Sequence, residues 1–101
     1  MNWLKYSQIN SIKPYKYIGQ CDRIRKNPDG ERFWRYVMGH AVPVSQEEFL
    51  NQCDISPLLD ENETVEQFLS DYRTVGYYKA NYNNTGYYWF GTRGFEFFFK
   101  R

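Results

Sequence analysis

Residues 74–100 read TVGYYKANYNNTGYYWFGTRGFEFFFK and form the most aromatic part of the chain. Twelve of the 21 aromatic residues in the chain lie between residue 72 and the C-terminus. Aromatic side chains favour strands because their bulk suits a pleated, half-buried surface. Two groups of turn-forming residues, 83–86 and 91–94, divide the stretch. The pattern therefore predicts three consecutive antiparallel strands, at residues 74–82, 87–90 and 95–100.

Residues 45–71 have a different composition, with eight acidic residues, no lysine or arginine, and only two of the aromatic residues. One helix is predicted at residues 46–52, because Ser45 and Glu48 have the spacing of a capping box at its start. A second helix is predicted at residues 61–72. Its apolar residues have the i, i+3, i+4, i+7 spacing of one buried stripe, and they are Val65, Phe68, Leu69 and Tyr72.

The N-terminal part of the chain is again rich in aromatic residues and predicts more sheet. Residues 15–25 and 31–38 are predicted as two strands of a hairpin around the turn at residues 27–30. Pro28 presets the backbone angle of the second turn position, and Gly30 tolerates the left-handed conformation that often follows such a turn.

These elements together predict a single α+β domain, since 101 residues is the length of one domain. The expected order is β-β-α-α-β-β-β, with an antiparallel sheet of about five strands and two helices on one face. Side chains alternate between the faces of a strand, so each pair of neighbouring tyrosines sends one ring to each face. We therefore expect Tyr78 and Tyr88 to contribute to an exposed aromatic face opposite the helices.

The sequence contains little that predicts catalysis. His40 is the only histidine, and no nucleophile motif, phosphate-binding loop or metal-ligand spacing accompanies it, so we expect no enzyme, cofactor or metal site. The alternative is a small enzyme that uses His40. Cys21 and Cys53 lack CxxC spacing and would remain thiols in a reducing compartment. Without a signal peptide or a long apolar run, we expect a cytoplasmic protein that does not bind membranes.

Charge is distributed unevenly, although the net charge of the chain is only +1. Residues 1–44 carry a charge of +5, residues 45–71 carry −8, and residues 72–101 carry +4. Such asymmetry can orient a protein toward a charged partner. Trp, Tyr and Arg are also the residue types that most often dominate protein interfaces. The predicted partner-binding residues are Arg23, Arg25, Lys26, Arg32, Trp34, Arg35, Tyr36, Tyr78 and Tyr88.

We interpret the chain as a small adaptor or inhibitor that binds a protein, or a second copy of itself, through the aromatic sheet face and the basic hairpin. Nucleic-acid binding through the same arginines and rings is the alternative, because arginine beside aromatic rings suits phosphate contact and base stacking. The acidic middle segment favours the protein partner, since it would repel a phosphate backbone.

Overall fold

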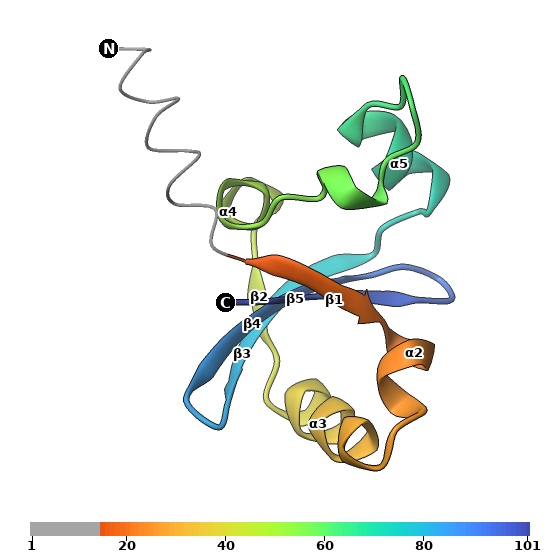
Figure 1. Cartoon of the computed structure of the whole chain (residues 1–101). Coiled ribbons are helices and arrows are strands. Elements are labelled where there is room, and N and C mark those ends of the chain that lie inside the picture. The colour runs from red at the N-terminus through yellow and green to blue at the C-terminus, as the bar shows by residue number, and fades with distance from the viewer. Residues whose placement is uncertain (1–14) are drawn as a thin grey trace.

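The computed structural model describes residues 15–101, which form a five-stranded antiparallel sheet with helices on both faces (Figure 1). The order of strands across the sheet is β1-β5-β4-β3-β2, so β1 and β2 are the two edges. This confirms the α+β class and the number of strands. The strands are β1 (Lys16–Gln20), β2 (Val42–Val44), β3 (Gly76–Tyr82), β4 (Thr85–Gly91) and β5 (Glu96–Lys100).

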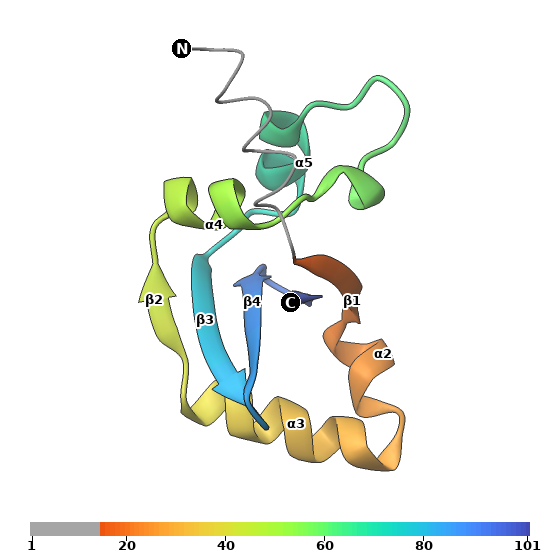
Figure 2. The same cartoon turned by 60° about the vertical axis from the view of Figure 1, so that its left-hand side comes forward.

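Two pairs of α-helices lie on opposite sides of the sheet, α2 and α3 on one side and α4 and α5 on the other (Figures 1 and 2). The helices of the acidic segment, α4 and α5, share one face as expected. The other pair, α2 and α3, comes between β1 and β2 along the chain and was not expected. The helical segments are α2 (Cys21–Arg25), α3 (Pro28–Gly39), α4 (Gln46–Gln52), a short 3-10 turn η1 (Ser56–Leu58) and α5 (Val65–Asp71).

The predicted hairpin of residues 15–25 and 31–38 is wrong beyond its first strand. Residues 16–20 do form β1, but α2 follows directly, and residues 31–38 lie inside α3. The residues interpreted as a turn begin a helix instead. The side chain of Asn27 caps α3 by accepting a hydrogen bond from the amide of Gly30, and Pro28 occupies the first helical position, where its missing N–H costs nothing.

The predicted helix at residues 46–52 is confirmed, and Ser45 caps it by accepting a hydrogen bond from the amide of Glu48 at 3.0 Å. The second helix begins at Val65 rather than residue 61. Its start is set by a capping box in which Thr64 and Gln67 each bond the other's backbone amide.

The three C-terminal strands form the predicted meander, in which β3 pairs with β4 and β4 pairs with β5. Asn83 and Asn84 connect β3 to β4 with φ angles of +52° and +63°. Two successive residues of positive φ are the requirement of the tight turn that matches the twist of a hairpin, and asparagine tolerates this conformation.

Aromatic residues fill the core on both faces of the sheet. On β4, Trp89 is buried against α3, and Phe90 is buried against α4 and α5. The expectation of an exposed aromatic sheet face is therefore wrong. Tyr88 is only 7% exposed because its ring lies in the core beneath α4. Tyr78 is half-buried on the opposite face, which α2 and α3 cover.

Candidate functional site

The basic residues predicted to bind a partner lie together on α2, α3 and the turn between them. Arg23, Arg25, Lys26, Arg32 and Arg35 are all exposed there. The acidic residues of α4, η1 and α5 lie on the other side of the sheet (Figure 1). The sheet thus separates a basic layer, formed by α2 and α3, from an acidic layer, formed by residues 45–71.

One flank of α3 holds an ordered cluster of charged and aromatic side chains. Glu31 accepts hydrogen bonds from Nε of both Arg25 and Arg35, each at 3.1 Å. The guanidinium of Arg25 also lies 4.4 Å from the ring centre of Trp34. Bonds from Arg35 and then Arg25 lower the pKa of Glu31, so its carboxylate stays charged. Exposed ion pairs contribute little stability, but they orient these side chains as a single surface.

Trp34 is anchored rather than free to move. Its indole Nε1 lies within 3.4 Å of Glu96 Oε1 on β5, to which it donates a hydrogen bond, and its ring packs against the core beneath α3. A half-buried tryptophan under an arginine loses little conformational entropy when a partner covers it, which is typical of residues that dominate interface energy.

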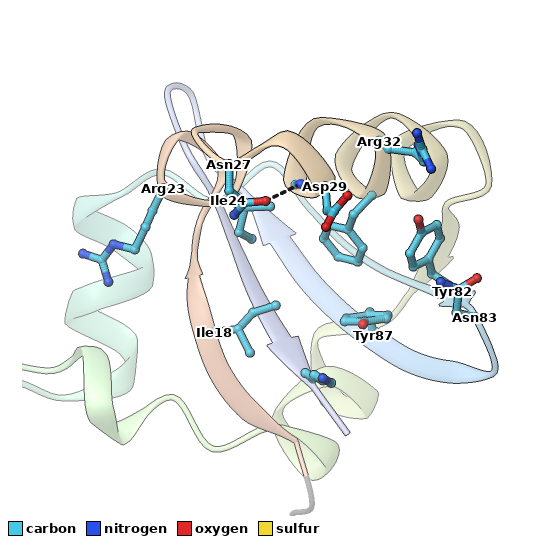
Figure 3. Close-up of a pocket in the computed structure, with 12 residues that line it drawn as sticks. Ile18, Arg23, Ile24, Asn27, Asp29, Arg32, Tyr82, Asn83 and Tyr87 are labelled. Carbon is cyan, nitrogen blue, oxygen red and sulfur yellow. Dashed lines mark hydrogen bonds between the residues drawn. The ribbon is translucent and has the colours of Figure 1, made fainter.

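The opposite flank of α3 borders a groove of about 750 Å³ over the β1–β5 side of the sheet (Figure 3). Helices α2 and α3 form one wall, and the strands form the floor. Ile18 on β1, which is 37% exposed, and Lys100 on β5 lie where no helix covers the sheet. The volume is within the range of ligand-binding cavities. Its lining includes Ile18, Arg23, Asp29, Arg32, Tyr87 and Lys100.

Positive charge is spread around this groove. Arg23 and Arg32 lie at opposite ends of it, with Asp29 between them (Figure 3). Within residues 15–101, neither arginine forms an ion pair, and neither does Lys100. The groove therefore offers three separate cations that remain available to a negatively charged ligand.

The rings beside the groove are already packed against one another. Phe33 makes edge-to-face contacts with Tyr87 and Tyr82, at centroid distances of 4.6 and 5.5 Å. Burial, followed by the nearby phenol of Tyr82, raises the pKa of Tyr87. The Tyr87 phenol therefore carries its proton at neutral pH and can act as a hydrogen-bond donor.

The remaining predicted residues are not brought into one site. Tyr36 is 42% exposed and stacks on His40, with ring centres 3.9 Å apart. The Nδ1 atom of His40 lies 2.8 Å from the Tyr36 carbonyl oxygen and donates to it, so the imidazole is held by its own helix end. Tyr78 stacks on Trp89 at the margin of the core beneath α3.

Tyr88 lies on the acidic side of the sheet, away from the basic layer. Its hydroxyl donates to Glu48 Oε2 at 2.8 Å, and Lys79 Nζ lies 3.2 Å from the same oxygen. These two bonds, that of Tyr88 first, lower the pKa of Glu48, whereas burial and the carboxylate raise the pKa of Tyr88. The Glu48 side chain thus fixes α4 to the sheet instead of completing a capping box with Ser45.

The residues of the groove that come from the sheet were not predicted, and they include Ile18, Tyr87 and Lys100. Their signal is long-range, because Lys100 pairs with Lys16 on one side and Tyr87 on the other. Only the pairing of β1 with the C-terminal strand places them together.

Among residues 15–101, no group of three or more histidine, cysteine or acidic side chains could hold a metal ion. In the same part of the chain, no helix is long and apolar enough to cross a membrane. Cys21 and Cys53 lie in the two different cores, on opposite faces of the sheet. No known protein family matches the chain, and neither a curated protein nor a solved structure matches it.

Proposed function

We propose that this protein is a small, non-catalytic binding module of the cytoplasm, an adaptor or inhibitor that engages an acidic protein surface through the basic layer. The observation that carries the proposal is the separation of charge by the sheet, with the exposed arginines of α2 and α3 on one side and the acidic residues 45–71 on the other. Such a charge distribution orients the basic layer toward a negatively charged partner and speeds its association.

A protein partner is favoured over a nucleic acid by the arrangement of charges within the basic layer. Arg25 and Arg35 share the carboxylate of Glu31, and Asp29 lies between the two arginines of the groove. A phosphate backbone carries closely spaced charges and binds best to uninterrupted positive charge. Mixed charges around an anchored tryptophan are instead typical of a protein interface.

The proposal is tested by capture from nuclease-treated lysate of the source cells, with two double variants of equal net charge. In Arg32→Glu/Arg35→Glu two exposed arginines of α3 are replaced by acidic residues. In Arg73→Glu/Arg93→Glu two exposed arginines outside the basic layer are reversed instead. We expect wild type and the second variant to retain one defined protein partner that the first variant loses. Equal capture by both variants, or a bound partner that nuclease removes, would overturn the proposal.

A further inference from the structure

The groove beside α3 differs from the rest of the basic layer, since it is concave and its cations are unpaired within the described part of the chain. Arg23 and Arg32 mark its two ends (Figure 3), and Lys100 of β5 also lines it. A single small anion cannot contact two arginines at opposite ends. The ligand that satisfies them must carry several negative charges along an extended chain.

A nucleic acid and an acidic peptide could both supply such charges, and the floor of the groove favours the peptide. Tyr87 and Phe33 are 8% exposed each and engage each other edge to face, so their ring faces are not available for stacking with nucleic-acid bases. The ring of Tyr82 also lines the groove and is partly exposed, but it too packs edge to face on Phe33. Ile18 is the most exposed apolar side chain of the lining, which it shares with Lys100. An aliphatic side chain fits this position because it gains from burial without needing a stacking platform.

The position of Asp29 also favours a peptide over a polynucleotide. Its exposed side chain lies in the groove between Arg23 and Arg32 (Figure 3). A polynucleotide has a charge at every step and would bring a phosphate near this carboxylate. A peptide can place a neutral residue there and its acidic residues on either side, where the arginines lie.

We propose that the groove formed by Arg23, Arg32, Lys100 and Ile18 binds an extended acidic segment of the protein partner, in which one aliphatic residue lies between acidic residues. This inference rests on the proposed function and names the chemistry of the partner. The carboxylates pair with the three cations, and the aliphatic side chain covers Ile18.

The binding test uses a short fluorescein-labelled peptide in which one leucine is flanked on both sides by glutamates. A second peptide has alanine in place of the leucine, and a single-stranded oligothymidylate matches their charge. We expect the leucine peptide to bind wild type most tightly by fluorescence anisotropy at low salt. Arg32→Glu and Ile18→Ala should each weaken it about tenfold or more. The matched charge reversal Arg93→Glu, in the turn between β4 and β5, should change affinity less than about twofold.

Circular dichroism establishes that each variant is folded, which is expected because all three side chains are exposed. Absence of peptide binding to wild type would overturn the inference. So would equal loss in Arg32→Glu and Arg93→Glu, or tighter binding of the oligothymidylate. Concentration-dependent self-association that Arg32→Glu abolishes would assign the groove to a second copy of the chain, against the proposal.

Capture with single variants separates this inference from the proposed function. Loss of the cellular partner in Arg32→Glu and in Ile18→Ala supports the groove. Loss in Arg35→Glu with full capture by Arg32→Glu would place the partner on the other flank of α3, so that the proposed function stands and the groove inference fails. Full capture of the partner by Arg32→Glu and by Arg35→Glu counts against the proposed function as well as against the groove inference.

Discussion

Replacing Gly30 with alanine tests the packing that holds the basic layer in place. Gly30 is buried in the first turn of α3, against the last turn of α2. A methyl group there would overlap the carbonyl oxygen of Ile24 and lie 2.7 Å from its carbonyl carbon and 2.8 Å from Asn27 Oδ1. Two of these three atoms belong to backbone, so α2 must move away from α3 to make room.

The size of the effect follows from three opposing contributions. Overpacking of a tight contact costs about 1–3 kcal/mol, and loss of the Asn27 cap on the Gly30 amide costs about 1 kcal/mol. Alanine is a better helix former than glycine and returns about 1 kcal/mol. We therefore expect Gly30→Ala to reduce the free energy of unfolding by about 1–3 kcal/mol, although helix propensity alone predicts an increase.

Gly39 provides the matched control at the other end of the same helix. No atom lies within 4 Å of a methyl group placed there, so Gly39→Ala should leave the free energy of unfolding unchanged or raise it by up to about 1 kcal/mol. Urea unfolding followed by tryptophan fluorescence measures both changes, with the slope of the transition as a check on two-state behaviour. Equal stability of the two variants would refute the claim that the contact of α2 with Gly30 is tight.

Three further predictions concern the acidic side of the sheet and the core. Phe49 is fully buried against aromatic residues of the sheet, so Phe49→Ala should lower the free energy of unfolding by about 3–5 kcal/mol in urea, and a loss below about 1 kcal/mol would contradict this packing. Bonds from Tyr88 and Lys79 lower the pKa of Glu48, so its carboxylate stabilises the fold above the ordinary carboxyl pKa and this contribution disappears as pH falls through the lowered value. Glu48→Gln should therefore destabilise at neutral pH, and the difference from wild type should shrink in acid; a difference that is constant with pH would contradict this. Burial raises the pKa of Cys21 to about 11, so iodoacetamide should alkylate this thiol slowly in the native protein at neutral pH and quickly once urea unfolds it. Rapid alkylation of the native protein that is absent in Cys21→Ser would contradict the burial of Cys21.

The elements that were predicted correctly have signals contained within a few residues. Ser45 caps α4 through an amide three residues away, and Asn83 with Asn84 form a two-residue turn. Neither feature depends on what the rest of the chain does. Periodicity likewise placed Phe68 and Leu69 in the core, although the helix starts later than expected, at the capping box that Thr64 and Gln67 form.

The hairpin error has a local origin too. The central residues of a type I turn have nearly helical backbone angles, so Asn27 followed by Pro28 suits a turn and a helix start equally. The following residues decide between them. As a strand, residues 31–38 have no purely apolar face, whereas as a helix they bury Phe33 and Val37 four positions apart. That spacing was the available signal for α3.

The residues of the candidate site were predictable in part, because residue type is local information and contacts between helices and strands are not. The arginines and Trp34 were identified from residue type, but the cation–π contact of Arg25 with Trp34 requires α2 to pack on α3. The groove is still less accessible to sequence reasoning, because its floor comes from β1 and β5, which lie at opposite ends of the described chain.

The position of the aromatic residues explains why the proposed partner surface belongs to the helices rather than to the faces of the sheet. Helices α2 and α4 have five and seven residues and supply few apolar side chains, so rings of the sheet such as Trp89 and Phe90 must fill the core on both faces. The two edge strands are blunted, β2 by Pro43 and β1 by an irregular register after Tyr17, features that discourage pairing with another strand. With its faces covered and its edges protected, the sheet offers a partner only the part of its surface that α2 and α3 leave open. A partner that reached this part would contact the arginines of the same two helices, so shape and charge direct it to one groove.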